Sequence, residues 1–244
     1  MRRIGLLWAV VAVIVLPPVI GGCSKTEGTG AVSEQPKGPT GGAVGSGGAG
    51  ANLRSDDAFV RDVALKNIAE IELSRIAVGK ATNPDIKSFA QRMLDDHGAA
   101  ADKLKSIVAG QIEWPDQLDE KQRKNATELG NKQSADFDRE YAKAMVDGHQ
   151  DLAAKLESRL DVQSLAQWKT AAAGRTQSRA LSEPDVALRD VQVRPDTSDS
   201  PFTMKINQWA ADTYPVTQKH LDTVRMLEIA TKDGRRSRGL DSPP

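Results

Sequence analysis

The sequence predicts an all-α fold, an antiparallel four-helix bundle with a long insertion between its third and fourth long helices. Aromatic residues make up only 4% of the 244-residue chain and charged residues 27%, a composition that favours helices over a β-sandwich or barrel. Apolar residues recur at steps of three and four along four long segments, as on the buried face of a helix. Short to moderate connections join the first three of these segments, which favours antiparallel neighbours.

The first two long helices are expected over residues 56–79 and 84–111. Ser55, Asp56 and Asp57 are placed to cap the first helix and to supply acidic groups to its first turn. The sequence Asn-Pro-Asp at 83–85 stops one helix and starts the next, because proline fits the first helical position.

A short polar helix is expected over residues 118–130 and the third long helix over 134–160. The last long helix is expected over 202–232. Pro215 lies inside it and predicts a kink, since proline cannot donate the helical backbone hydrogen bond.

Residues 161–200 form the insertion. Residues 163–181 could be helical, whereas 182–201 contain three prolines and many acids and are expected to form an exposed loop. This connection is long for a bundle, which predicts a functional insertion or a mobile excursion.

The N-terminus has the features of a bacterial lipoprotein signal. Two arginines precede an apolar run, and Ile-Gly-Gly-Cys at 20–23 resembles a lipobox, so residues 1–22 are expected to be removed and Cys23 to be lipidated. An uncleaved membrane anchor is the alternative, although two consecutive prolines in the run disfavour a membrane helix. Ser24, rather than aspartate, follows the cysteine, which predicts an outer-membrane lipoprotein facing the periplasm; the inner membrane is the alternative.

The remaining chain divides into three parts. Residues 23–54 are the lipidated cysteine and a Gly-rich tether, with too little apolar surface to fold. A coil of this length and composition spans about 30 Å, so it can hold a folded domain away from the membrane. The helical bundle is expected over 55–233, and a disordered basic tail over 234–244.

Composition and motifs argue against several classes of function. Lys+Arg and Asp+Glu both number 33, which argues against a nucleic-acid partner. A single cysteine allows no intramolecular disulfide and no cysteine-based zinc or iron–sulfur site. The sequence has neither a phosphate-binding glycine loop nor a Gly-x-Ser-x-Gly elbow, so no motif supports an enzyme.

Several segments carry a distinctive combination of residues: AEIEL at 69–73, NPDIK at 83–87, FAQRMLDDH at 89–97, FDREY at 137–141 and MVDGH at 145–149, with Tyr214-Pro215 and His220-Leu221 in the last helix. Over residues 56–158 and 203–231 the chain resembles the domain-of-unknown-function family numbered 4142. The resemblance implies a ferritin-like four-helix bundle, secreted or located in the envelope, with no established activity. The insertion departs from the family, in which this connection is short.

The three histidines of the chain are the most informative site candidates. His97, His149 and His220 each fall on the apolar stripe of a different long helix, so their imidazoles could meet inside the bundle. A carboxylate of the first helix could join them. Glu70 and Glu72 both qualify by helical phase, and the family resemblance favours Glu70.

Two interpretations of these residues remain open. Three imidazoles and a carboxylate suit a mononuclear site for one transition-metal ion such as Zn²⁺, Cu²⁺ or Fe²⁺. The same groups could instead form a buried polar network, with Tyr141 or Thr213, that fixes the helix register. A di-iron site is not expected, because no glutamate lies three positions before any of the histidines.

The sequence therefore predicts an envelope lipoprotein that is not an enzyme. Its helical bundle is expected to act as a binding module or as a structural or stress-related module. Its expected partners are the membrane, through Cys23, and a metal ion, an envelope protein or peptidoglycan. The alternative is a metal-binding or metal-handling protein that uses the three histidines, with one transition-metal ion as its cofactor.

Overall fold

A computed structural model describes residues 47–178 and 191–233 of the chain. The expected signal peptide, Cys23, most of the tether and the basic tail lie outside the described residues. The described residues form helices and no strand, apart from an isolated antiparallel bridge between Leu160 and Pro195. The helices are α1 (Gly47–Lys80), α2 (Pro84–Val108), α3 (Glu120–Gly130), α4 (Ser134–Glu157), α5 (Val162–Ser178) and α6 (Pro201–Lys232).

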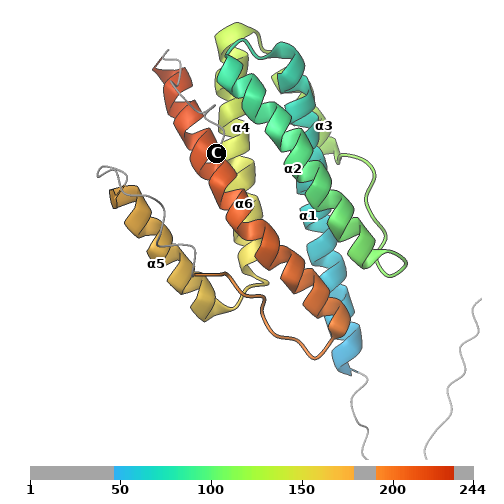
Figure 1. Ribbon diagram of the computed structural model, residues 1–244. Helices are drawn as coiled ribbons and strands as arrows, with labels where there is room; N and C mark the ends of the chain where they lie inside the picture. The colour runs from blue at the N-terminus through green and yellow to red at the C-terminus, as the bar shows by residue number, and fades with distance from the viewer. Residues whose placement is uncertain (1–46, 179–190, 234–244) are drawn as a thin grey trace, which may run out of the picture. The chain divides into compact units, whose positions relative to one another are not determined.

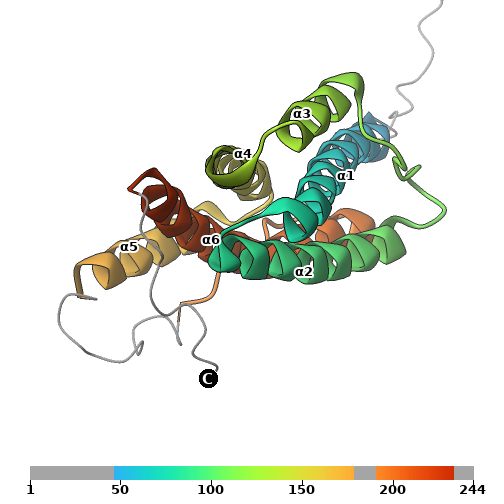
Figure 2. The ribbon, with the colours of Figure 1, turned by 90° about the horizontal axis from the view of Figure 1, so that it is seen from above.

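Helices α1, α2, α4 and α6 are the long elements of a bundle (Figure 1). α4 packs against α6 and α1, and α2 packs against α1 and α6. Seen from above, α3 lies beside α1 and α4, and α5 lies beside α6 (Figure 2). The prediction of an all-α bundle is confirmed, whereas the likeness to ferritin stays a prediction.

The start of α1 differs from the prediction. The helix begins at Gly47, well before the expected cap. Asp56 is buried and accepts hydrogen bonds from Arg159 Nη1 at 2.5 Å and from Thr203 Oγ1 at 2.7 Å. Asp57 forms an ion pair with an arginine one turn later. The expectation that these acids cap the helix was wrong, because a tertiary ion pair uses Asp56 and the helix continues through it.

The other helix ends lie within a few residues of the predicted ones. α2 begins at the predicted Asn-Pro-Asp sequence, and Asn83 caps it, since its side chain accepts a hydrogen bond from the Asp85 backbone. α2 ends at Val108 and α4 at Glu157, each three residues earlier than predicted. α6 continues as one helix through Pro215, and the kink there stays a prediction.

The insertion is partly packed against the bundle. Its first half forms α5, as the sequence allowed. Residues 191–196, which were expected in an exposed loop, bond through their backbone to residues 159–161, and the Val193 side chain is buried. The segment is a loop as predicted, and Gln192, Arg194 and Asp196 are exposed. The expectation of exposure was wrong at Val193, whose apolar side chain reaches the core.

A polar layer divides the core into two apolar clusters. The Tyr214 cluster includes Phe59 and Trp209, and the Tyr141 cluster includes Phe137. On each long helix a buried glutamate or histidine lies between members of the two clusters, so the layer crosses the whole bundle. From the Tyr214 cluster, through the polar residue, to the Tyr141 cluster, the order is Val63, Glu70 and Ala77 on α1; Leu104, His97 and Met93 on α2; Leu152, His149 and Met145 on α4; and Tyr214, His220 and Leu221 on α6.

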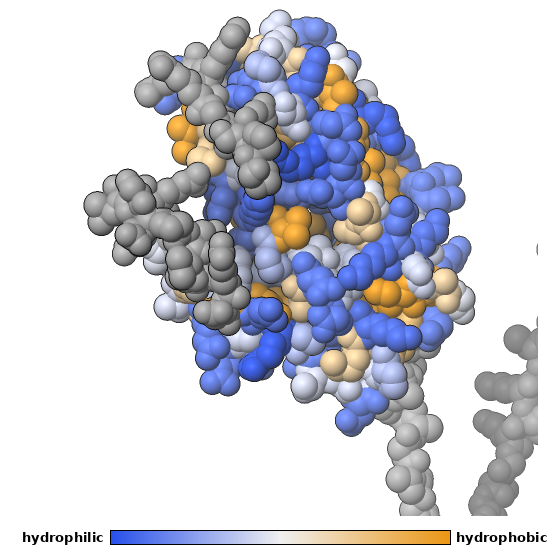
Figure 3. Space-filling view, viewed as in Figure 1, coloured by the Kyte–Doolittle hydropathy of each residue, from blue (hydrophilic) through white to orange (hydrophobic). Residues whose placement is uncertain are grey.

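The outer surface is mainly hydrophilic on the face that Figure 3 shows, with separate hydrophobic patches. Over residues 47–178 and 191–233, no helix combines the length and the apolar character needed to cross a membrane. The large hydrophobic side chains exposed in this part of the chain are Val162, Val216, Met226 and Ile229.

Candidate functional site

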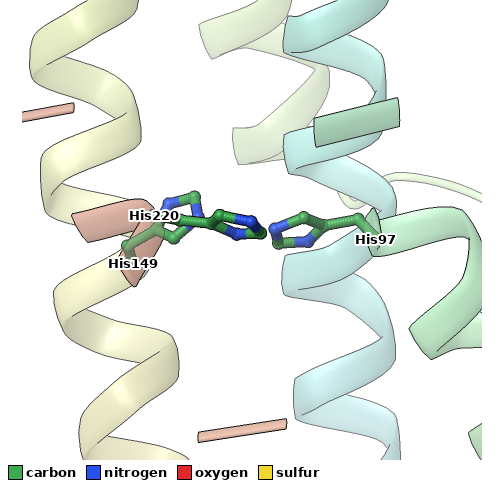
Figure 4. A group of neighbouring side chains, drawn as sticks. All are labelled: His97, His149 and His220. Atoms are coloured by element: carbon green, nitrogen blue, oxygen red, sulfur yellow. The ribbon is translucent and has the colours of Figure 1, made fainter. Parts of the chain in front are cut away.

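The candidate site is the polar layer at mid-bundle, which we call the histidine layer: Glu70, His97, His149 and His220. The four helices of the bundle supply one side chain each. The exposed fraction is 3% for Glu70, 5% for His97, 0% for His149 and 3% for His220. The three imidazoles point toward one another, although they come from α2, α4 and α6 (Figure 4). The structure thus places all four sequence candidates in one buried layer.

The three rings form a nearly equilateral triangle. Their centroids lie 5.2 Å apart for His97 and His149, 5.6 Å for His149 and His220, and 5.7 Å for His97 and His220. One nitrogen of each ring lies within 4.8 Å of those of the other two. Phe89 packs against both His149 and His220, with centroid distances of 6.3 Å, so an aromatic ring covers one side of the triangle.

Each imidazole has one nitrogen, here called its outer nitrogen, that bonds to an oxygen atom of the protein. Because each acceptor is an oxygen, the outer nitrogen carries the hydrogen and the other, inner nitrogen keeps its lone pair. Asn67 also donates from Nδ2 to the His97 carbonyl at 3.0 Å, which orients its amide oxygen toward the ring. The three pairs are His97 Nδ1 with Asn67 Oδ1 at 2.9 Å, His149 Nδ1 with the Met145 carbonyl at 2.9 Å, and His220 Nε2 with Asp96 Oδ2 at 2.8 Å.

The histidine layer concentrates polar atoms that have no hydrogen-bond partner. In the described part of the chain five buried side-chain atoms have none, and four belong to this layer: both Glu70 oxygens, His149 Nε2 and His220 Nδ1. The fifth is Asn207 Oδ1. Leaving such a group unpaired costs about 1–3 kcal/mol. Groups of this kind in folded proteins point to a functional role or to a water or ion that completes them.

Glu70 lies beside the outer nitrogens, not the inner ones. Its Oε2 is 3.2 Å from His97 Nδ1, and its Oε1 is 3.6 Å from His149 Nδ1. The group able to hold an ion therefore consists of the three histidines, with the carboxylate next to it. Glu72, the other candidate by helical phase, is partly exposed and pairs with Arg75.

Burial favours the neutral forms of the layer. Burial and the proximity of His149 and His220 hold the pKa of His97 well below its usual value. Burial and His149 lower the pKa of His220 to about 4, although the bond to Asp96 acts in the opposite direction. Burial raises the pKa of Glu70, and His149 offsets part of that effect. His97 and His220 are therefore neutral at pH 7, the form in which imidazole binds a metal.

The spacing of the rings suits one metal ion. A ring centre lies about 1.1 Å behind its nitrogen, and metal–nitrogen bonds are about 2.0–2.1 Å long. Three imidazoles on one tetrahedral or trigonal ion therefore have centres about 5.2–5.5 Å apart, close to the 5.2–5.7 Å observed. The layer has a single carboxylate, fewer than a di-iron site requires.

Sequence reasoning missed three residues of this site. Asn67 lies three positions before Glu70, a spacing that a search for polar residues on one helix face could have found. Asp96 follows no local signal, because its partner, His220, lies 124 positions along the chain. Gly148 stands in a helix interior, and its role depends on a contact with α1.

Two residues proposed for a buried network lie elsewhere. The Tyr141 hydroxyl bonds to Ser74 Oγ at 2.9 Å, and Thr213 Oγ1 donates to the Trp209 carbonyl at 2.7 Å. Neither hydroxyl supplies a hydrogen bond to an imidazole, so the unpaired atoms of the layer are not completed by these side chains.

The fold and the site together define an α-helical bundle protein with a buried three-histidine cluster. The chain belongs to the family described as Domain of unknown function (DUF4142), whose model matches residues 43–178. This match contains Glu70, His97 and His149 and ends before α6, which carries His220. Comparison with curated proteins and with solved structures found no match.

Proposed function

We propose that the protein binds one transition-metal ion through His97, His149 and His220. The observation that carries the proposal is the pairing of the three buried rings: every outer nitrogen has an oxygen acceptor, whereas the inner nitrogens of His149 and His220 have no partner. Metal-binding histidines have this pattern, because the acceptor fixes the tautomer and ring direction and leaves a lone pair for the ion.

A purely structural network explains less of this geometry. Polar groups that only fix helix register are stabilising when they pair with one another. In the histidine layer the inner nitrogens face other imidazoles, and Glu70 makes no hydrogen bond. An ion among the rings would accept the lone pairs that no donor of the described chain reaches.

The donor set also restricts the ion. Imidazole suits Zn²⁺, Cu²⁺, Ni²⁺ and Fe²⁺, whereas Mg²⁺ and Ca²⁺ prefer oxygen ligands. Three protein ligands leave a coordination position for water or another small molecule. Because the ligands come from three helices, the site exists only in the folded bundle, and ion binding would stabilise the fold.

Metal analysis of the untagged protein tests this proposal. After loading with Zn²⁺ or Cu²⁺ and dialysis into metal-free buffer, we expect mass spectrometry to find about one ion per chain, and His97→Ala to lose it. Thr203→Val is the control, because it removes a hydrogen-bonding group from another part of the core. Far-UV circular dichroism checks the fold of both variants. Wild-type protein that retains none of Zn²⁺, Cu²⁺, Ni²⁺ or Fe²⁺ would contradict the proposal and favour the structural network.

We also propose that Cys23 attaches the protein to the bacterial envelope, with the bundle in the periplasm. The sequence at 20–23 supports lipidation, and the Gly-rich tether supplies about 30 Å of reach. Serine at position 24 favours the outer membrane. Cys23→Ser should release the protein from membranes in cell fractionation, whereas Ser24→Ala should not. Continued attachment of the Cys23→Ser protein would point to an uncleaved anchor instead.

A further inference from the structure

We infer that Glu70 is the positioning carboxylate of this metal site: it contacts the outer nitrogens of His97 and His149 together, in a recess that Gly148 leaves open. The inference rests on the proposed metal binding and assigns one acidic side chain to two ligands. It gives Glu70 a role different from that of a fourth ligand.

The side of the rings that Glu70 occupies excludes direct ligation in this arrangement. Its oxygens lie 3.2 Å from His97 Nδ1 and 3.6 Å from His149 Nδ1, the nitrogens that already bond to other oxygens. An ion bound at the inner nitrogens would lie across both rings from the carboxylate. Glu70 can therefore act on the ion only through the imidazoles.

The surroundings of Glu70 leave its carboxylate without a hydrogen bond. Both oxygens are buried and neither has a hydrogen-bond partner. A carboxylate in such a place is unfavourable unless positive charge lies near it. A divalent ion on His97 and His149 would supply that charge and would make their outer N–H groups more positive, which strengthens their electrostatic attraction to Glu70.

Gly148 makes room for this carboxylate. A Cβ atom at position 148 would lie 2.5 Å from Glu70 Oε1 and 3.4 Å from Glu70 Cδ, too close for normal contact. The helical glycines at 79, 98, 130 and 174 have nothing within 4 Å of a Cβ placed in the same way. Glycine inside a helix costs roughly 0.5–1 kcal/mol relative to alanine. Its presence next to His149 therefore fits the close approach of Glu70.

The third ring has a carboxylate of its own. Asp96 bonds to the outer nitrogen of His220 at 2.8 Å, and its side chain is 42% exposed. The two carboxylates thus serve all three rings, but only Glu70 is buried and shared. A substitution of Glu70 should therefore affect two metal ligands, His97 and His149, at once.

Co²⁺ titration of the purified protein tests the inference, since the visible absorption of Co²⁺ reports its ligand geometry. Glu70→Gln keeps the shape of the side chain but removes its negative charge, which acts on both rings. We expect Co²⁺ to bind about 10- to 100-fold more weakly, with an altered visible spectrum. Glu72→Gln on the same helix is the matched control, and it should keep wild-type affinity and spectrum.

Gly148→Ala provides a second, independent test, because its methyl group would displace the Glu70 carboxylate without removing it. We expect the same weakening and spectral change, and no further loss in the double variant Glu70→Gln/Gly148→Ala. A merely structural role would lower the melting temperature of the metal-free protein but leave Co²⁺ affinity and spectrum unchanged. That result in either folded variant would overturn the inference. Failure of the wild-type protein to bind any ion would instead refute the proposed function.

Discussion

Two buried polar clusters join the helices of this bundle, and they differ in how completely their atoms are paired. In the first, which we call the Asp56 cluster, Asp56 accepts hydrogen bonds from Arg159 and Thr203 and so links α1 to the turn that follows α4 and to the start of α6. Arg159 also donates to the Ser55 carbonyl at 2.9 Å, and its guanidinium lies 4.5 Å from the centre of the Phe59 ring. The second cluster is the histidine layer, which contains four unpaired atoms.

The difference distinguishes a structural role of the Asp56 cluster from the proposed binding role of the histidine layer. The Asp56 cluster satisfies its buried carboxylate within the chain, so it requires no additional group. In the histidine layer the unpaired atoms lie on Glu70 and on imidazoles whose outer nitrogens are paired. Such a selective deficit is expected where a ligand completes the site, and it carries a cost to the stability of the metal-free protein.

The largest expected effect comes from breaking the paired cluster. Asp56→Ala leaves the Arg159 guanidinium without its partner in a largely buried position, and loss of one partner of a buried pair costs about 3–5 kcal/mol. Urea unfolding of the metal-free protein measures this change. Asp57→Ala, which removes an exposed ion pair one residue away, is the control and should cost less than about 1 kcal/mol. Equal effects of the two substitutions would show that the Asp56 cluster does not hold the helices together.

Completing the unpaired layer should have the next largest effect. A ligand that binds only the folded protein stabilises it by about 2.7 kcal/mol when its free concentration is 100 times Kd. We therefore expect Zn²⁺ to raise the unfolding free energy of wild-type protein by about this amount, measured against the same protein in chelator. Thr203→Val alters only the Asp56 cluster, so it should keep the full increment. An increment that disappears in Thr203→Val would mean that the two clusters are not independent.

The sequence predicted the helices and the inward position of the histidines well, for a physical reason. Residues that face the core of a helical bundle recur every three or four positions, and this signal is local. It was sufficient to place His97, His149 and His220 on inner faces. The pairing of Asp56 with Arg159, 103 positions away, has no local signal, so the same residue was taken for a helix cap.

The details of the site could not be predicted from periodicity. Whether Glu70 approaches the inner or the outer nitrogens depends on the ring orientation of His97 and His149, which packing and local hydrogen bonds determine. The pairing of Asp96 with His220 depends on the register of α2 against α6. Gly148 was visible as a glycine inside a helix pattern, but the neighbour that requires it belongs to another helix.

Acidification should weaken the metal-free protein through the histidine layer. The folded pKa values of His97 and His220 are lowered below the unfolded value of about 6.5, so the unfolded chain binds more protons and stability falls as pH drops from about 6.5 toward 4. Glu70 acts oppositely: its folded pKa is raised, so the folded state binds more protons above about 4.5 and gains stability as pH falls there.

Two bases, His97 and His220, oppose one acid, Glu70, and Asp96 and His149 are their charged or titratable neighbours. The net slope should therefore stay below about 2.7 kcal/mol per pH unit, the value for two protons. Glu70→Gln removes the opposing acid and should make the slope steeper. Ser74→Ala, a change at a non-titrating buried residue of α1, should leave it unchanged. The measurement is urea unfolding in chelator at several values between pH 4.5 and 7. An equal slope in wild type and Glu70→Gln would contradict the assigned shift of Glu70.

The smallest effect should come from removing an unpaired atom of the layer. His149→Leu eliminates the buried Nε2 and loses one hydrogen bond, from Nδ1 to the Met145 carbonyl. That carbonyl remains in the helical backbone, so the metal-free protein should lose only about 0.5–1.5 kcal/mol, the net worth of one hydrogen bond. Asp56→Leu, a change to the same apolar residue in the fully paired cluster, should cost several times more because it strands Arg159. Urea unfolding of both variants in chelator gives the comparison. His149→Leu should also abolish the increase in unfolding free energy that Zn²⁺ produces. A variant that is nearly as stable as wild type but cannot bind the ion would support a binding role for the layer, in contrast to the structural role of the Asp56 cluster. Equal destabilisation by the two substitutions, with the Zn²⁺ increment retained, would mean that the layer acts as a structural network like the first.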